Sequence, residues 1–239
     1  MRFAGYRLSP GSYLGLHLAV GLVLSIFFVW LFLEIAEGVL TNEEIVAIDY
    51  WVSAHVLYLR SSFTNTLMIC ATNLGGVAFV LSAGSLIVGF LLVKGHPDKA
   101  AGFAAAILGG QLLNVLLKII IQRQRPTDIN ALVHAGGWSF PSGHAMMSTV
   151  FYGMAAYFLV RSTGSWRMRV AWVALSGFMM LLIGLSRVYL HVHYLSDVLA
   201  GFAAGLFWLT VCITGLNAYE MRRSAVRGTT VQIKDTPAP

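Results

Sequence analysis

The chain has 239 residues, 57% of them hydrophobic and 11% charged, and its formal net charge at pH 7 is +6. Soluble domains carry about 25% charged residues, so this composition excludes an ordinary soluble domain and predicts a protein of the lipid bilayer. The positive charge comes without a basic face or interleaved aromatic residues, which argues against a nucleic-acid partner. The two cysteines stand far apart in apolar surroundings and predict neither a disulfide framework nor a metal cluster.

Six apolar runs are long enough to cross a bilayer. A membrane-spanning helix needs roughly 20 apolar residues, and because lipid cannot bond to the backbone, helices are expected rather than an open sheet. The first run is longer than the apolar core of a signal peptide, and no convincing cleavage site follows it, so we expect it to be retained. The six predicted spans are residues 13–33, 74–93, 100–121, 143–161, 170–187 and 195–216.

The expected fold class is an all-α bundle of six transmembrane helices, formed by a single membrane-embedded domain over residues 1–220. Between the first two spans, residues 41–60 carry apolar side chains at the spacing of one helix face. We interpret this segment as an amphipathic helix on the outer membrane surface, and an ordinary helix packed on the bundle explains it equally well. Residues 221–239 are polar and basic, and they predict a disordered cytoplasmic tail. The apolar positions of the predicted helix at residues 41–60 are Ile45, Ile48, Val52, Val56 and Leu59.

The basic residues indicate how the chain is oriented in the membrane. If the N-terminus is cytoplasmic, most of the 16 lysines and arginines fall in cytoplasmic segments, in keeping with the positive-inside trend. Both termini are then cytoplasmic, and the third to sixth spans have neighbouring ends on the outer face. We therefore interpret the net charge of +6 mainly as a topology signal.

Three polar clusters interrupt or border the spans, and ionisable residues at membrane depth mark functional sites by default. The first cluster is the stretch KIIIQRQRP at the end of the third span. Lys118 lies about two helical turns before Arg125, so both side chains can reach one point, and Pro126 is expected to stop the helix. Arginine offers a planar fork for phosphate oxygens, and lysine offers a point charge. Snorkelling at a helix end is the competing explanation, and Arg123 and Gln124 are interpreted as rim residues.

The second cluster is the PSGH stretch that opens the fourth span. Pro141 fixes the entry, Ser142 is a natural N-cap, and Gly143 lets a ligand approach the backbone. The free N–H groups and the dipole of the helix start then form an anion site. His144 lies in this first turn and is a candidate general acid once an anion is bound. Simple helix initiation explains the stretch as well when it is taken alone.

The third cluster, SRVYLHVHYLSD, connects the fifth and sixth spans. His193 and Asp197 are four residues apart, so on a helix the carboxylate can hold one ring nitrogen and leave the other free to attack. Arg187 adds a cation at the end of the preceding span. A structural contact at a helix end is the alternative for this pair. With six spans, however, all three clusters fall on one outer face, where they predict a single pocket for phosphoryl transfer.

Together these motifs resemble the signatures of the type 2 phosphatidic acid phosphatase superfamily, a group of membrane-bound lipid phosphatases. The matching elements are Lys118-x6-Arg125-Pro126, Pro141-Ser142-Gly143-His144 and Ser186-Arg187-x5-His193-x3-Asp197. They cover residues 118–197, and the six-span layout extends the resemblance over most of the chain. Residues 1–73 are much less diagnostic.

The resemblance implies a metal-independent phosphatase without a cofactor that works through a phosphohistidine. His193 would be the nucleophile, Asp197 its orienting partner, and His144 the group that protonates the leaving oxygen. The residues implied to bind the phosphoryl oxygens are Lys118, Arg125, Arg187, Ser142 and the backbone of Gly143. The chain departs from many relatives at His191, where they have glycine, and at Ser196, where they have proline. Neither is a motif position.

The expected activity is hydrolysis of a lipid phosphate or diphosphate at the outer face of a bacterial inner membrane. Undecaprenyl diphosphate is slightly favoured over phosphatidylglycerol phosphate and phosphatidic acid, and a lipid A phosphatase or a lipid-to-lipid phosphotransferase is also open. A transporter would need charges near mid-membrane and repeated halves, and neither is evident. A metal site built on His144, His191 and His193 is disfavoured because residues i and i+2 of a helix diverge.

Overall fold

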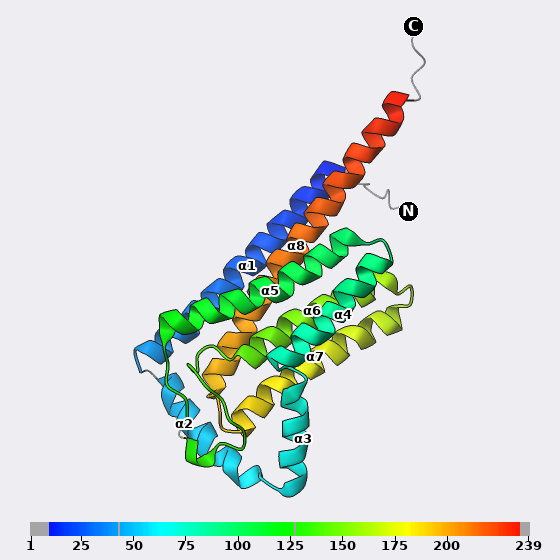
Figure 1. The fold of residues 1–239 in the computed structure, drawn as a ribbon. Coiled ribbons are helices and arrows are strands. Elements are labelled where there is room, and N and C mark those ends of the chain that lie inside the picture. The colour runs from blue at the N-terminus through cyan, green and yellow to red at the C-terminus, as the bar shows by residue number, and fades with distance from the viewer. Residues whose placement is uncertain (1–9, 43, 127, 235–239) are drawn as a thin grey trace, which may run out of the picture.

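The computed structural model describes residues 10–42, 44–126 and 128–234, and it is built from helices (Figure 1). The described part of the chain contains no strand, so the predicted all-α class is confirmed. Two short 3-10 helices, η1 (Leu57–Leu59) and η2 (Asp128–Asn130), accompany the longer elements. The α-helices are α1 (Pro10–Leu40), α2 (Glu44–Val56), α3 (Ser62–Asn73), α4 (Val77–Val93), α5 (Pro97–Ile121), α6 (Gly143–Ser162), α7 (Trp166–Tyr189) and α8 (Leu195–Lys234).

Four helices, α1, α5, α7 and α8, are long and apolar enough to cross a membrane by themselves. A fifth span is possible if α3 and α4, which meet at an angle of 46°, are counted as one broken helix. The predicted count of six spans is not confirmed, because α6 is not among these helices. It lies inside the bundle against α4, α5, α7 and α8. Nine of its 20 residues are buried, so protein rather than lipid surrounds much of this helix.

Small residues on α8 bring it close to α6. A Cβ atom on Gly201 would lie 2.7 Å from the carbonyl oxygen of Ser142, and one on Gly205 would lie 2.9 Å from that of Met146. Glycines four residues apart on one helix face allow two backbones to approach closely in membrane proteins. The seam formed by Gly201 and Gly205 therefore holds the first turns of α6 against the first turns of α8.

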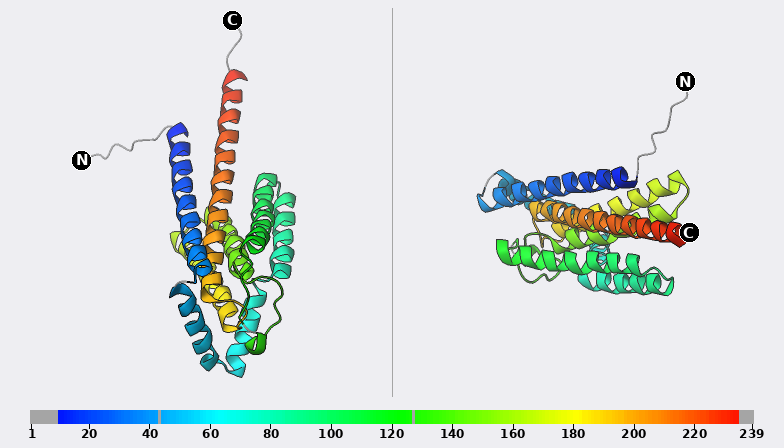
Figure 2. Two further views of the ribbon diagram at one scale, coloured as in Figure 1. Left: turned by 90° about the vertical axis from the view of Figure 1, so that its left-hand side faces the viewer. Right: turned by 90° about the horizontal axis from the view of Figure 1, so that it is seen from above.

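The two ends of the bundle differ. The C-terminal ends of α5 and α7 and the N-terminal ends of α6 and α8 gather near α2, while the start of α1 and the end of α8 lie at the opposite end (Figures 1 and 2). All three predicted polar clusters are therefore at one end. The described part of α8 runs to Lys234, so it is helical over most of the segment 221–239, and residues 235–239 lie outside the described residues.

Helix α2 packs on the bundle end, against α1, α7 and α8. The predicted apolar face is correct at Val52 and Val56, which are partly buried. It is wrong at Ile48 and Leu59, whose side chains are exposed. The buried residues of α2 are Val46, Asp49 and Ser53. The helix is rotated relative to the prediction because Asp49 forms an ion pair inside the protein.

Helix α5 ends at residue 121, as the third predicted span does, but it does not continue to Pro126. Helix α5 stops at Ile121 because Gln122 adopts a left-handed conformation, with a φ of 50°, and its N–H bonds back to the carbonyl of Lys118. Pro126, the predicted stop, therefore lies in the connection after the helix. The prediction was wrong because proline is only one way to end a helix, and a left-handed residue ends it without one. Residues 122–125 have no regular secondary structure.

The seam between α6 and α8 gives a first prediction. Gly201→Ala places a methyl group against a backbone oxygen that cannot move aside, so we expect it to lower the free energy of unfolding by about 1–3 kcal/mol and to slow any reaction at this end of the bundle. Gly215→Ala is the matched control, because no heavy atom lies within 4 Å of a Cβ at this position of the same helix. Thermal unfolding in detergent compares the two variants, and equal stability would contradict the close packing.

Candidate active site

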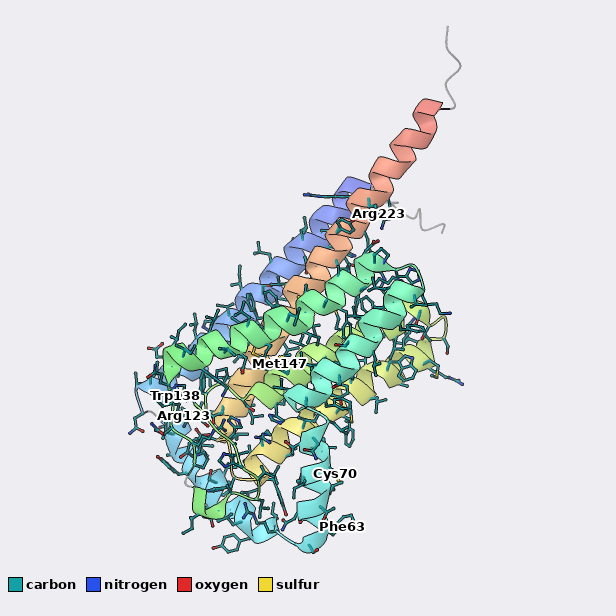
Figure 3. The ribbon with its side chains drawn as sticks, in the orientation of Figure 1. Phe63, Cys70, Arg123, Trp138, Met147 and Arg223 are labelled. Atoms are coloured by element: carbon teal, nitrogen blue, oxygen red, sulfur yellow. The ribbon has the colours of Figure 1, made fainter. Side chains whose placement is uncertain are left out.

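The three predicted clusters meet at the bundle end that carries α2. The Lys118 amino group and the Arg125 guanidinium both donate to the carbonyl oxygen of Trp138, at 2.6 Å and 3.2 Å. The same guanidinium lies 3.0 Å from Nε2 of His193. Trp138 marks this place in Figure 3, next to Arg123. Residues from the connection after α5 and from the α7–α8 connection are thus brought to one point, although they are far apart in the sequence.

His193 is buried and bonded at both ring nitrogens. Its Nδ1 lies 3.3 Å from the carboxylate of Asp197, and its Nε2 faces an N–H group of Arg125. A guanidinium can only donate, so Nε2 must offer its lone pair and the proton must sit on Nδ1. Burial, more than the nearby positive charges, lowers the pKa of His193 to about 3. The imidazole is therefore neutral at physiological pH, with its unprotonated nitrogen turned toward a cation.

The carboxylate of Asp197 is bonded at both of its oxygens. Its Oδ2 accepts from the hydroxyl of Ser139 at 2.5 Å and from the backbone N–H of Tyr194 at 2.9 Å. The Ser139 oxygen also lies 3.3 Å from Nδ1 of His193. Ser139 belongs to the loop before α6 and was not singled out from the sequence. Sitting two residues ahead of the PSGH stretch was the only signal that pointed to it.

The PSGH stretch starts α6 beside this carboxylate. The backbone N–H of Ser142 donates to the carbonyl of Asp197 at 2.9 Å. Ser142 occupies the N-cap position, but its hydroxyl makes no capping bond and is buried without a hydrogen-bond partner. A Cβ on Gly143 would lie 3.0 Å from the side-chain oxygen of Asn114, so glycine fits this close approach. The helix start is therefore placed by backbone contacts, and the Ser142 hydroxyl remains available for another bond.

His144 and Arg187 complete the site from the side of the α3–α4 bend. Arg187 is 4% exposed, donates to the hydroxyl of Thr72 at 2.6 Å, and has no partner for its Nε. His144 is within electrostatic range of Arg187 and His193. Its Nε2 would lie 3.7 Å from a Cβ on Gly76. The broken helix therefore forms one wall of the site.

Two charged residues were missed or misread from the sequence. Arg123, interpreted as a rim residue, donates to both Asp197 and Asp49 at 2.7 Å. Asp49, which no sequence pattern singled out, is 1% exposed. In the non-helical stretch after α5, Arg123 and Arg125 are half-buried and Gln124 is exposed. The expectation that the helix continued to Pro126 left this alternation unnoticed.

His191, where many relatives have glycine, has a φ of 60°. This left-handed conformation favours glycine and explains that preference. The side chain is buried, and its Nδ1 has no hydrogen-bond partner. Among the described residues, no three histidine, cysteine, aspartate or glutamate side chains lie close enough to hold a metal ion, so His191 does not join His144 and His193 in such a group.

The buried imidazole of His193 gives a prediction on pH. The unfolded chain takes up its proton near pH 6.5 and the folded chain only near 3, so the free energy of unfolding falls as the pH drops through this window. Above the window this group contributes no pH dependence. We expect His193→Gln, which cannot take up the proton, to lose less thermal stability than the native chain between about pH 6.5 and about pH 4. His134→Gln, an exposed loop histidine, is the control, and equal slopes for all three proteins would contradict the buried neutral state.

A helical membrane bundle with a buried histidine–carboxylate pair and several cations at one end is the architecture of a membrane-bound phosphatase. Residues 99–220 match the family model of the PAP2 superfamily. The chain is also 36% identical over 180 residues to phosphatidylglycerophosphatase B of Bacillus subtilis (strain 168), across 73% of this chain and 86% of the relative. The chain belongs to the PAP2 superfamily and is a membrane lipid phosphatase.

Two further comparisons support this assignment. The crystal structure of a transmembrane PAP2-type phosphatidylglycerolphosphate phosphatase from Bacillus subtilis superposes with a TM-score of 0.74 and 30% identity, over 83% of this chain and 96% of that one. A lipid A 1-phosphatase of Rhizobium etli is 36% identical over 158 residues, which are 56% of this chain and 63% of the relative. The resemblance inferred from the three motifs is confirmed.

Proposed function

We propose that this enzyme removes the terminal phosphate of a lipid phosphate through a phosphohistidine formed on His193. The observation that carries the proposal is the bonding of this imidazole. Asp197 binds the Nδ1 side of the ring, which leaves the lone pair of Nε2 for attack on phosphorus. Nη1 of Arg125 lies 3.0 Å from Nε2, so it could bind an oxygen of a phosphoryl group placed there. Nucleophile, orienting carboxylate and phosphate-binding cation are thus in contact with one another.

The proposed reaction has two steps. In the first, Nε2 of His193 attacks phosphorus, the bond from phosphorus to the lipid oxygen breaks, and His144 gives its proton to that oxygen. In the second, water attacks the phosphorus, His144 takes up a proton from the water, and the phosphorus–nitrogen bond breaks. Inorganic phosphate leaves, and both histidines return to their starting states. Each step uses only water and side chains of this chain.

The charge of the site suits a phosphate dianion. In the described cluster around His193, the cations exceed the carboxylates by two, so a dianion would balance the charge. Ser142 Oγ and Arg187 Nε are buried without partners, an unfavourable state that two phosphoryl oxygens would relieve. The cations are Lys118, Arg123, Arg125 and Arg187, and the carboxylates are Asp49 and Asp197.

We further propose that the site opens at the extracytoplasmic face of a bacterial inner membrane. It lies at the bundle end opposite to the start of α1 and the end of α8 (Figure 1). The far end also carries the α4–α5 and α6–α7 connections, which are flanked by basic residues such as Lys94 and Arg167. Cytoplasmic segments are enriched in lysine and arginine, which supports this orientation.

Phosphatidylglycerol phosphate is the best supported substrate. A Bacillus subtilis relative named for this activity is 36% identical over 73% of this chain, and a crystal structure of a Bacillus subtilis phosphatase with the same named activity matches it with a TM-score of 0.74. Lipid A carrying a 1-phosphate is the second candidate, because the Rhizobium etli relative is also 36% identical, over a shorter stretch. Undecaprenyl diphosphate, slightly favoured from the expected topology alone, and phosphatidic acid complete the set to be tested.

The nucleophile is tested by His193→Ala with phosphatidylglycerol phosphate in detergent and a chelator. Loss of a catalytic nucleophile lowers turnover by up to about a million-fold, so phosphate release should fall to background. His134→Ala, which changes a histidine that is exposed in the loop before α6, should retain native turnover. After an alkaline quench, labelled substrate should leave phosphate on the native chain and none on His193→Ala. Hydrolysis retained by His193→Ala would refute the proposed mechanism.

The substrate is tested by measuring kcat/KM for the purified chain with the four lipids. We expect the highest value for phosphatidylglycerol phosphate, the lipid for which the matching Bacillus subtilis phosphatase is named. The contacts to the phosphate are common to all four lipids, so the selection among them must come from the rest of the headgroup. A tenfold preference corresponds to about 1.4 kcal/mol of transition-state stabilisation. A higher value for lipid A 1-phosphate would replace the first candidate with the second.

A further inference from the structure

We propose that Asp49 and Arg123 are positioning residues for phosphoryl transfer. They fix the carboxylate of Asp197, and through it the imidazole of His193, without touching the phosphate. This inference rests on the proposed nucleophilic role of His193. It makes α2, a helix outside the three polar motifs, part of the catalytic apparatus.

Arg123 bridges two buried carboxylates from different helices. Its Nη1 donates to Oδ1 of Asp197 in α8, and its Nη2 donates to Oδ2 of Asp49 in α2, both at 2.7 Å. The guanidinium also lies 4.3 Å from the centre of the Tyr194 ring, which restricts it from a third side. Asp49 and Asp197 hold the pKa of Arg123 above its usual value despite burial, so the bridge stays charged.

Ser196 closes this bridge into a ring. Its backbone N–H donates to Oδ1 of Asp49 at 2.9 Å, and its hydroxyl donates to the other oxygen of the same carboxylate. The hydroxyl also accepts from Arg123 at 2.7 Å. Ser196 immediately precedes Asp197 in the first turn of α8. Asp49 therefore bonds to the backbone next to Asp197 and also to Arg123, whose guanidinium contacts the Asp197 carboxylate. In the sequence, Ser196 was noted only because the resemblance implies proline at this position in many relatives.

The two bonded oxygens of Asp197 have different tasks. Oδ2 faces His193, and Oδ1 faces Arg123. A carboxylate held at both oxygens cannot rotate, so the direction of its bond to Nδ1 is fixed. A buried ion pair adds little net stability compared with an apolar pair of the same size. Orientation of the reactive imidazole is a function that an apolar pair would not supply.

The sign of the pH effect follows from the charges around His193. Arg123 offsets the negative charges of Asp49 and Asp197, so its removal makes proton uptake by the His193–Asp197 pair easier. The acid limb of kcat/KM should then move to higher pH, whereas removal of the Asp49 charge should not raise it. The charged and titratable groups that face the pair are Lys118 from α5, Arg123 and Arg125 from the following connection, His144 from α6, Arg187 from α7, Tyr194 beside it, and Asp49 from α2.

The test uses the purified full chain with phosphatidylglycerol phosphate in detergent. Arg123→Met should lower kcat by about 10- to 100-fold, as loss of a group that orients a reactive side chain does, with KM within about twofold because the phosphate-binding cations remain. Its acid limb should move to higher pH. Arg123→Lys should recover part of kcat. Asp49→Asn should lower kcat less, without raising the acid limb.

A double variant provides the sharpest comparison. If Asp49 acts only through Arg123, then Asp49→Asn combined with Arg123→Met should be no slower than Arg123→Met alone. It also removes the Asp49 charge that Arg123→Met alone would leave buried without its partner, so it keeps the test informative if Arg123→Met folds poorly. Glu220→Gln, which breaks the ion pair with Arg161 at the far end of the bundle, is the matched control and should keep native kcat and acid limb.

Two results would overturn the proposal. One is a loss of thermal stability in Arg123→Met without a change in kcat or in the acid limb. The other is a double variant that is slower than Arg123→Met, which would mean that Asp49 acts independently. His193→Ala is assayed in parallel. Activity retained by His193→Ala would remove the proposed mechanism itself, whereas its loss, together with either of the two results, would remove only the positioning role.

Discussion

The site depends on one carboxylate. Asp197 accepts hydrogen bonds from Arg123 in the connection after α5, from Ser139 in the loop before α6, and from the backbone at the start of α8. Its own carbonyl accepts from the backbone N–H of Ser142 at the start of α6. A buried charge is tolerated only when it is paired and hydrogen-bonded. Folding therefore has to bring these segments together, and the same bonds that satisfy Asp197 place the imidazole of His193, the proposed nucleophile.

This arrangement also explains why the polar residues gather at one end of the bundle. Charged side chains are costly at membrane depth, so a chain with 11% charged residues concentrates them where they can pair with each other. The interior of the bundle is left to apolar packing, such as the cluster around Phe103, Met147 and Val150. At the proposed phosphate site the buried positive charges exceed the negative ones by two. Stability of the fold favours pairing of every buried charge, whereas the proposed binding of phosphate requires an excess of positive charge. Both requirements fall on the same few residues.

Much of the fold and part of the site could be predicted from the sequence. The apolar runs predicted an all-α membrane bundle, and the i to i+4 spacing predicted the contact between His193 and Asp197. The span 100–121 was predicted with the correct end, but the way the helix stops was not, because it depends on the left-handed Gln122 rather than on Pro126. The partner of Arg123 was hidden for a related reason. A carboxylate 74 residues away on another helix leaves no local pattern, and only the packing of α2 brings it near.

The seam of α6 and α8 has a consequence for how the family's chemistry can vary. The start of α6 lies against α8 because Gly201 and Gly205 have no side chain. The distance between the start of α6 and the imidazole of His193 therefore depends on the absence of two methyl groups. A substitution in this seam would move the start of α6 by at least the width of one carbon atom. Both positions should therefore tolerate less change than Gly215 of the same helix, where a methyl group would have no neighbour within 4 Å.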